Sequence, residues 1–387
     1  MKFMVEALRI AEHGRFTCMP NPMVGCVIVK NNHIVGSGAH LKAGEHHAEI
    51  NALIEAGALA CGADVYLTLE PCSHFGRTPP CVDALIAASV KSVHIAISDP
   101  NPLVAGKGIT KLHQAGISVF LGECAQEAYE LNKVFFYYIT HKKPFVIVKW
   151  AMSLDGKIAR NRNDALHRNN WITSESARAH AHNLRAQVGA IMVGENTVRL
   201  DDPELTVRYG MGDGLYTLPR PIVLTVEGNL AHNSKLFAAG RNTLVMTSHK
   251  ACPNFLAMLD KNNIEHCFVS SDNNFLSLPE ILDKLGSLGI SSVLVEGGSQ
   301  LLTSFFNAGL VNKIYTYMAP KIIGGADSLS PIMGNNFLQK HGEFYVKPKE
   351  IVQLGPDICF VSETSLTPAM YDDFIATCKE SRKCLVV

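Results

Sequence analysis

The sequence lacks an excess of charge of either sign. Its 35 Lys and Arg residues balance 35 Asp and Glu residues, so the formal net charge is zero at neutral pH. Proteins that bind nucleic acid usually carry a basic excess or a basic stripe, and neither is visible here. We therefore expect no nucleic-acid partner, while a small phosphorylated ligand remains compatible with the composition.

Long apolar runs are also missing. None approaches the ~20 residues that a helix needs to cross a bilayer, so we expect no membrane partner. The first 14 residues, "MKFMVEALRIAEHG", interleave charged and apolar residues, which predicts an amphipathic helix and not a signal peptide. The 11 cysteines show no spacing typical of a disulfide scaffold. We therefore expect a cytoplasmic protein in a reducing compartment.

Internal repeats, low-complexity tracts and a glycine-rich dinucleotide fingerprint are absent as well. The 387 residues, 47% of them apolar, instead alternate between strand-like and helix-like segments. This alternation predicts an α/β fold with helices on both faces of a sheet. In the first part we expect a hairpin around "KNN" (30–32), a helix over 47–60, and strands over 65–69 and 92–98.

A polar segment that ends in proline, "ITHKKPF" (139–145), separates an apolar helix from a new strand and predicts a domain boundary. We expect one domain over 1–143, a second α/β domain over 144–363, and an appended helix and tail over 364–387.

One group of residues carries chemistry that packing does not require. "HAE" supplies His47 and Glu49, and "EPCSHFGRTPPC" (70–81) supplies Cys72 and Cys81. One His and two Cys are good ligands for tetrahedral zinc, and three protein ligands leave a position for a water molecule. Glu49 is then placed to move protons, provided that the motif lies in the first turn of its helix, because residues two apart face away from each other in mid-helix.

Two other interpretations of this group stay open. A structural zinc site would need a fourth ligand, which His46 or His74 could supply. The residues could also come together without any metal.

A second candidate site follows a predicted strand in "VLVEGGSQLL". The strand ends at Glu296, two glycines allow close backbone approach, and a helix begins. Helix N-termini hold phosphate groups through free N–H groups. An ordinary strand-turn-helix unit would have the same pattern.

Taken together, these motifs resemble the bifunctional RibD family of riboflavin biosynthesis. The deaminase half is matched by "HAE", by the long loop between the cysteines, and by "DPNP" (99–102). The reductase half is matched by "KWAMSLDGKIA" (149–159), "WIT" (171–173), "LRA" (184–186), "VGENTVRLDDPELTVR" (193–208) and "VEGG". The resemblance implies a cytidine-deaminase-like α/β/α layered domain followed by a dihydrofolate-reductase-like α/β domain.

For the first domain, the resemblance implies hydrolytic deamination of 2,5-diamino-6-ribosylamino-4(3H)-pyrimidinone 5′-phosphate with one zinc ion per chain. Zinc would activate the attacking water, and Glu49 would move its proton and help to expel ammonia. The residues implied to contact this substrate are Asn21, His40, His74, Arg77, Asp99 and Asn101. Asn21 and Asp99, which adjoin prolines, could instead be turn residues.

For the second domain, the resemblance implies that NADPH reduces the ribosyl group of the deaminated product to a ribityl group. The implied cofactor contacts are Ala151, Trp171, Thr173, Thr197, Asp201, Gly297, Gly298, Ser299 and Gln300. The implied substrate contacts are Lys149, Asn169, Arg185, Leu205, Arg208 and Glu296. Asn169 stands where the family has a serine, so we expect an altered contact with the substrate there. "VLTVEG" (223–228) replaces the usual "VLDS", so we expect the ribose or adenine side of the cofactor to be bound differently.

Two alternative functions stay open. A zinc deaminase whose second domain has lost reduction would not oxidise NADPH. An RNA-editing deaminase on the same zinc fold would be retained on RNA with a normal salt dependence. We also expect a homo-oligomer.

Overall fold

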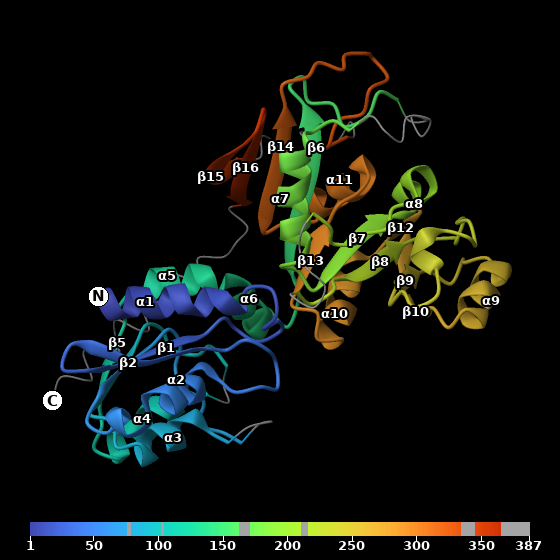
Figure 1. Ribbon diagram of the computed structural model, residues 1–387. Helices are drawn as coiled ribbons and strands as arrows, with labels where there is room; N and C mark the ends of the chain where they lie inside the picture. The colour runs from blue at the N-terminus through green and yellow to red at the C-terminus, as the bar shows by residue number, and fades with distance from the viewer. Residues whose placement is uncertain (76–78, 102–103, 162–170, 210–215, 334–344, 365–387) are drawn as a thin grey trace. The chain divides into compact units, whose positions relative to one another are not determined.

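The computed structural model describes residues 1–75, 79–101, 104–161, 171–209, 216–333 and 345–364. Contacts between residues divide the chain into two compact units (Figure 1). Unit 1 is Met1–Lys142, and unit 2 begins at Lys143, next to the predicted boundary. Almost all of the predicted appended segment, 365–387, lies outside the described residues.

Unit 1 is built on a five-stranded sheet in the order β2-β1-β3-β4-β5. Its strands are β1 (Gly25–Lys30), β2 (His33–Ala39), β3 (Asp64–Leu67), β4 (Ser92–Ile95) and β5 (Ser118–Leu121). Strands β3, β4 and β5 are parallel, and β1 is antiparallel to both of its neighbours. The predicted hairpin is confirmed: Asn31 and Asn32 take positive φ angles of 50° and 65°, as a tight two-residue turn requires.

Helices cover both faces of this sheet. They are α1 (Lys2–Ala11), α2 (Ala48–Ala56), α3 (Cys81–Ala87), α4 (Lys107–Gln114), α5 (Ala125–Leu131) and α6 (Lys133–His141), with short 3-10 turns η1 (Glu12–Gly14) and η2 (Gly57–Ala60). Side chains alternate along a strand, so Ile28 packs with α2, α3 and α4 while Val27 packs with α1, α5 and α6. The unit is therefore a layered α/β/α structure.

Three predicted segments end earlier than expected. The helix predicted over 47–60 is α-helical only to Ala56, because Gly57 has a φ of 52° and η2 follows. The strands predicted over 65–69 and 92–98 pair only as far as Leu67 and Ile95. The residues after these strand ends form loops, and those loops carry candidate site residues.

Unit 2 contains a nine-stranded sheet in the order β10-β9-β8-β7-β13-β6-β14-β16-β15. Its strands are β6 (Phe145–Ser153), β7 (Ala190–Gly194), β8 (Arg220–Leu224), β9 (Leu244–Thr247), β10 (Glu265–Phe268), β13 (Ser292–Val295), β14 (Lys313–Ala319), β15 (Val346–Leu354) and β16 (Asp357–Thr364). All neighbours from β10 to β14 are parallel, and β16 and β15 are added antiparallel. A separate two-stranded ribbon pairs β11 (Ser271–Asp272) with β12 (Phe275–Leu276).

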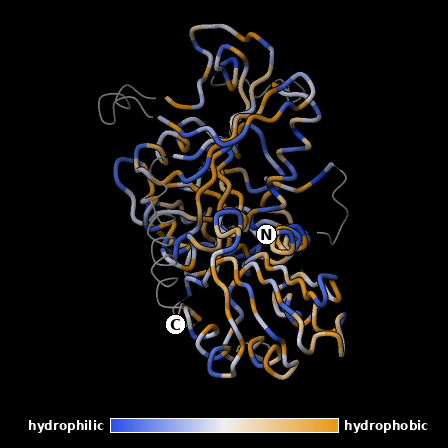
Figure 2. Tube along the Cα trace, turned by 90° about the vertical axis from the view of Figure 1, so that its left-hand side faces the viewer, coloured by the Kyte–Doolittle hydropathy of each residue, from blue (hydrophilic) through white to orange (hydrophobic). Residues whose placement is uncertain are grey.

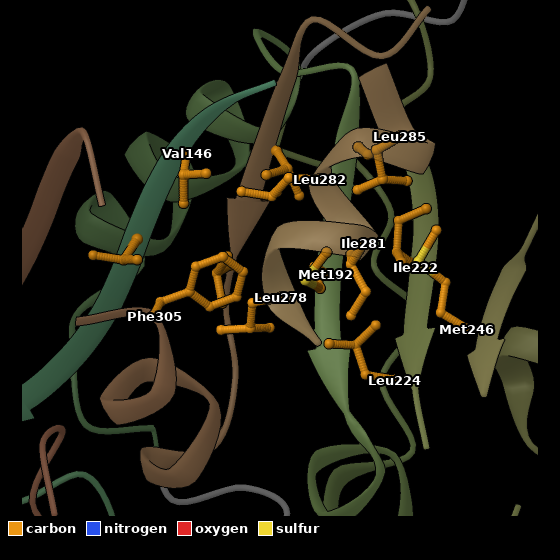
Figure 3. Packing of buried hydrophobic residues seen from close by; sticks show 14 of the residues in the cluster. Val146, Met192, Ile222, Leu224, Met246, Leu278, Ile281, Leu282, Leu285 and Phe305 are labelled. Atoms are coloured by element: carbon orange, nitrogen blue, oxygen red, sulfur yellow. The ribbon is translucent and has the colours of Figure 1, made fainter. Parts of the chain in front are cut away.

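The helices of unit 2 are α7 (Glu175–Arg185), α8 (Glu195–Asp201), α9 (Pro253–Lys261), α10 (Leu278–Ser287) and α11 (Ser299–Asn307), with a 3-10 turn η4 (Lys235–Phe237). Figure 3 shows α10 and α11 directing Ile281 and Phe305 onto the central strands, where they meet Val146 and Met192. Helix α7 packs on the opposite face, against β14 and β16. Because side chains alternate along β6, Val146 and Val148 face α10 and α11, and Lys149 faces α7.

Hydrophobic residues follow the strands of both units, whereas many of the connecting loops are hydrophilic (Figure 2). Within the described residues, no helix combines the length and the apolarity that crossing a membrane would require.

Candidate active sites

In unit 1 a histidine and two cysteines converge from three separate segments. His47 is the residue that precedes α2, Cys72 lies in the loop after β3, and Cys81 is the first residue of α3. Their ligand atoms all lie within 4.8 Å of one another. Among the described residues, neither His46 nor His74 joins this group.

The contacts within this group are short and polar. His47 Nδ1 lies 3.6 Å from Cys72 Sγ and 3.2 Å from Cys81 Sγ, and the Cys81 backbone N–H donates to Cys72 Sγ at 3.3 Å. The hydrogen bond from the Cys81 thiol, with smaller contributions from His47 and the Cys81 backbone N–H, lowers the pKa of Cys72, although Cys72 is partly buried. A hydrogen bond to Cys72 raises the pKa of His47. The group therefore contains thiolate and imidazole donors that could hold a metal ion.

Glu49 lies beside this group in the first turn of α2, as the sequence predicts. Its side chain is only 3% exposed. Burial raises the pKa of Glu49 to about 7, and the nearby Cys72 acts in the same direction. A carboxyl group in this range can both accept and release a proton near neutral pH.

Asn21 and His40, both predicted to contact substrate, form a chain that leads toward His47. His40 Nδ1 bonds the backbone oxygen of His46 at 3.1 Å, so this nitrogen carries the proton. His40 Nε2 then accepts from Asn21 Nδ2 at 2.9 Å. Its ring meets the His47 ring edge-on, with centroids 5.2 Å apart. Burial lowers the pKa of His40, which favours this neutral tautomer.

Asp99 and Asn101 come together with Glu70, a residue that the motifs did not single out. Asp99 accepts a hydrogen bond from the Asn101 backbone at 2.8 Å. Glu70 is 4% exposed and accepts from the backbone N–H groups of Asp99, Gly106, Gly108 and Ile109 at 3.1 to 3.4 Å. Glu70 therefore joins the cysteine loop to the loop that carries Asp99.

The remaining predicted contacts of this site are less defined. His74 is exposed. Arg77 lies outside the described residues, as does Asn169 of the second site.

In unit 2 a buried ion pair lies at the carboxyl end of β13. Arg185, the last residue of α7, donates to both oxygens of Glu296 at 2.6 and 2.7 Å. Lys149 Nζ on β6 lies 3.6 Å from Glu296 Oε2. Burial by itself raises the pKa of Glu296, but Arg185 and Lys149 outweigh it and lower the pKa to about 2.

A loop at 205–209 runs beside this ion pair. Arg185 Nη1 donates to the Thr206 backbone oxygen at 2.9 Å. Leu205 is buried with a positive φ of 49°. The Arg208 backbone N–H donates to His182 Nδ1 at 3.0 Å, while the half-exposed Arg208 side chain reaches Glu204 at 3.1 Å. Of the two predicted arginines, Arg208 is thus the one on the surface.

The glycine turn after β13 approaches α8 closely. A Cβ on Gly297 would lie 2.7 Å from Thr197 Oγ1, so a larger residue would clash with the Thr197 side chain. Gly298 has a φ of 57° and precedes α11, whose first residue is Ser299. The Ser299 hydroxyl donates to the Ser330 backbone oxygen at 2.7 Å, and the Gln300 side chain accepts from Asn196 at 3.3 Å.

The other predicted cofactor contacts are spread over three elements. Ala151 lies on β6, and Asp201 is the exposed last residue of α8. Trp171 is 55% exposed, and Thr173 is buried just before α7. Two residues that the motifs did not single out adjoin this segment and the 205–209 loop: Arg178 and His182 on α7.

Family models match both units. The cytidine and deoxycytidylate deaminase zinc-binding region matches residues 1–97, which include His47, Glu49, Cys72 and Cys81. The RibD C-terminal domain matches residues 144–360, which is more than half of the chain.

Whole-length relatives agree with these matches. The chain is 41% identical to the riboflavin biosynthesis protein RibD of Bacillus amyloliquefaciens, over 92% of this chain and 94% of the relative. It is 40% identical to that of Escherichia coli K12, over 92% and 97%. RibD of Acinetobacter baumannii has a similar structure, with a TM-score of 0.85 and 34% identity over 94% of this chain and 98% of the other.

A deaminase/reductase from Thermotoga maritima has a TM-score of 0.79 and 33% identity, over 94% of this chain and 98% of the other. The matches thus extend through both units and through both sets of site residues. This chain belongs to the RibD family of riboflavin biosynthesis proteins.

Proposed function

We propose that this RibD-family enzyme catalyses two consecutive steps of riboflavin biosynthesis with separate sites. Unit 1 hydrolyses the 2-amino group of 2,5-diamino-6-ribosylamino-4(3H)-pyrimidinone 5′-phosphate. Unit 2 then reduces the ribosyl group of the product to a ribityl group with NADPH. The observation that carries this proposal is the convergence of His47, Cys72 and Cys81 beside the buried Glu49.

Zinc fits the three ligands of unit 1. Tetrahedral ligands at about 2.0–2.3 Å from zinc lie roughly 3.5 Å apart, which is close to the His47–Cys72 distance of 3.6 Å. Cys72, whose pKa is lowered, and Cys81, the buried first residue of α3, supply two sulfur ligands of the kind that zinc binds. When bound with one open position, zinc makes water a nucleophile at neutral pH.

Glu49 is the proton carrier of this site. It accepts a proton from the attacking water and delivers protons to the ring nitrogen and to the departing ammonia. Its burial keeps the carboxyl group away from solvent. Asn21, with His40 behind it, and Asp99 and Asn101 hold the pyrimidine and ribose, and His74 and Arg77 contact the ligand from the cysteine loop.

The reductase site lies in unit 2, at the edge of the sheet where the parallel strands β13 and β6 have their carboxyl ends. Arg208 binds the 5′-phosphate because its guanidinium is half-exposed and matches phosphate geometry. Arg185 and Lys149 hold Glu296 beside the substrate. Leu205 and Asn169 complete the substrate contacts.

NADPH fits the glycine turn of unit 2, where Gly297 and Gly298 carry no side chains and the Gly297 backbone packs directly against Thr197, itself a proposed cofactor contact. The backbone N–H groups of Gly298, Ser299 and Gln300 at the start of α11 would hold a phosphate group of the cofactor. Its remaining contacts are Ala151, Trp171, Thr173, Thr197 and Asp201. When bound, NADPH supplies the hydride, and these residues fix its orientation.

We further propose that the enzyme works in the cytoplasm as a homo-oligomer on small phosphorylated pyrimidines. The test supplies the diaminopyrimidine phosphate to the full chain and follows ammonia release and NADPH oxidation. Both signals are expected, in that order. Ammonia without NADPH oxidation would remove the reductase half of the proposal, and the absence of ammonia would remove the deaminase half.

A further inference from the structure

One face of α7 carries a row of three polar side chains, Arg178, His182 and Arg185. Their spacing of four and three residues places them on the same side of the helix. This row contacts two segments that are distant from each other in the sequence: the segment 171–173, just before α7, and the loop 205–209. The first segment carries proposed cofactor contacts, and the loop carries proposed substrate contacts.

Arg178 contacts both segments with one guanidinium group. Its Nη1 donates to the Thr173 backbone oxygen at 2.7 Å, and its Nε donates to the Tyr209 hydroxyl at 3.0 Å. The guanidinium carbon also lies 4.8 Å from the centroid of the Trp171 ring. A planar group with several fixed donors can make all three contacts at once, which a lysine ammonium cannot reproduce.

His182 fixes the same loop one turn further along α7. Its buried Nδ1 accepts the Arg208 backbone N–H at 3.0 Å, and its ring lies 5.0 Å from that of Tyr209. Burial, with Arg185 and Arg208 adding to it, lowers the pKa of His182 to about 4. The imidazole is therefore neutral at physiological pH and remains able to accept this hydrogen bond.

The backbone of the loop needs such support. Leu205 and Tyr209 have φ angles of 49° and 65°, in a region that residues other than glycine rarely adopt. A conformation of this kind persists only where surrounding contacts hold it. The contacts from Arg178 and His182 are made to Tyr209 and Arg208 at the end of this loop.

We infer that Arg178 and His182 are positioning residues of the reductase site. Arg178 holds the loop 205–209 against the segment 171–173, and His182 fixes the backbone that carries Arg208. This inference rests on the proposed reductase function, in which Trp171 and Thr173 meet NADPH and Arg208 meets the substrate phosphate. It follows that binding of NADPH and binding of the pyrimidine are coupled through Arg178.

The test uses the full chain with Arg178→Ala, Tyr209→Phe and the double variant. Arg178→Ala is expected to raise the KM for both NADPH and the pyrimidine by about tenfold to a hundredfold, because it removes charged hydrogen bonds, with a smaller change in kcat. Tyr209→Phe should raise only the KM for the pyrimidine. The double variant should match Arg178→Ala, since the two residues make one contact. Arg178→Lys should not restore either KM.

His182 has its own pair of variants. His182→Ala is expected to raise the pyrimidine KM by about tenfold through loss of one hydrogen bond to the backbone, and to leave the Kd for NADPH unchanged. His182→Asn keeps an acceptor near the position of Nδ1 and should restore most of the loss. Calorimetric titration with NADPH measures Kd independently of turnover.

Arg220→Ala is the matched control, because Arg220 makes an ion pair with Glu265 at the amino end of β8 and does not touch either segment. Unchanged KM values in Arg178→Ala, or additive effects of Arg178→Ala and Tyr209→Phe, would overturn the inference. A wild-type chain that binds no NADPH and oxidises none would instead overturn the proposed reductase. Deamination should stay unchanged in every variant.

Discussion

Glu49 illustrates how one residue's position determines what it can do. Helix α2 begins at Ala48, so Glu49 lies in its first turn, while His47 precedes the helix with an extended backbone, and Glu49 interacts with both His47 and Cys81 although His47 is only two residues away. Further along a helix the same two residues would face apart. The carboxyl group is buried beside the ligand group, where a proton carrier has to be.

Replacing Glu49 by Gln should remove deamination and leave the zinc ligands in place. The amide cannot carry a proton, and loss of general acid–base catalysis costs about 10²- to 10⁴-fold in rate. Ammonia release and zinc content measured on the same sample check this. Glu55→Gln, on the exposed side of α2, should retain normal deamination. Near-normal turnover in Glu49→Gln would refute the proton-carrier role.

Glu296 gives a prediction on stability against pH. Its pKa is about 2 in the folded chain and has an ordinary value of 4.5, so the folded state favours the charged form. The resulting stabilisation, about 3 kcal/mol, is fully present above the ordinary pKa and is lost as the pH falls toward 2.

In urea unfolding between pH 7 and pH 3, the free energy of unfolding of unit 2 should therefore fall more steeply with decreasing pH for the wild type than for Glu296→Gln. Glu265→Gln is the control, because Glu265 is 51% exposed and its ion pair contributes little. Equal slopes for the wild type and Glu296→Gln would contradict the role of the buried pair.

At the scale of elements, both sites form where a loop leaves the carboxyl end of a parallel strand. β3 ends at Leu67 before the cysteine loop, and β13 ends at Val295 before the glycine turn. Parallel strands place such ends at one edge of the sheet, where ligands of α/β proteins bind. The helices α3 and α11 that follow these loops then present their amino ends to the sites.

Glu70 connects the cysteine loop, which follows β3, to helix α4. Its carboxylate accepts hydrogen bonds from backbone N–H groups at the amino end of α4. Glu70→Ala leaves those groups without their acceptor and should destabilise unit 1 by about 1–3 kcal/mol. We also expect weaker zinc retention, since Cys72 lies two residues further along the same loop. Zinc loss under a chelator and thermal unfolding measure these effects. Glu45→Ala, at an exposed surface pair, should change neither.

At the scale of the whole molecule, each unit has its own hydrophobic core and its own site. Arg208→Ala should therefore raise the reductase KM for the pyrimidine, by about tenfold for a lost charged contact, and leave deamination unchanged. Parallel assays of both reactions on one preparation test this. If both activities fell together, the two sites would not be independent.

Much of both sites follows from the sequence because the information is local. His47, Glu49 and Cys81 stand at helix starts and Cys72 in the loop before α3, all within two short motifs, so their residue types and spacing already indicate the chemistry. The glycine turn is similar, since Gly297 and Gly298 directly follow a buried strand.

The residues that the motifs missed depend on partners far away in the sequence: backbone N–H groups for Glu70 and His182, and the Tyr209 hydroxyl for Arg178. Glu70 reaches N–H groups 29 to 39 residues away, and Arg178 and His182 reach partners 31 and 26 residues away. A backbone N–H exists at nearly every position, so no residue type marks the partners of Glu70 and His182, and the sequence does not indicate which of its tyrosines Arg178 contacts. These contacts emerge only when the chain folds and brings the loops together.

The most direct measurement of this account is the zinc content of the purified chain, determined by elemental analysis without added metal. About one zinc ion per chain is expected for the wild type and for the exposed control Cys61→Ser. Cys72→Ser should bind almost none and lose deamination in parallel. A wild-type chain that deaminates without zinc, or a Cys72→Ser chain with full zinc and full activity, would contradict the account.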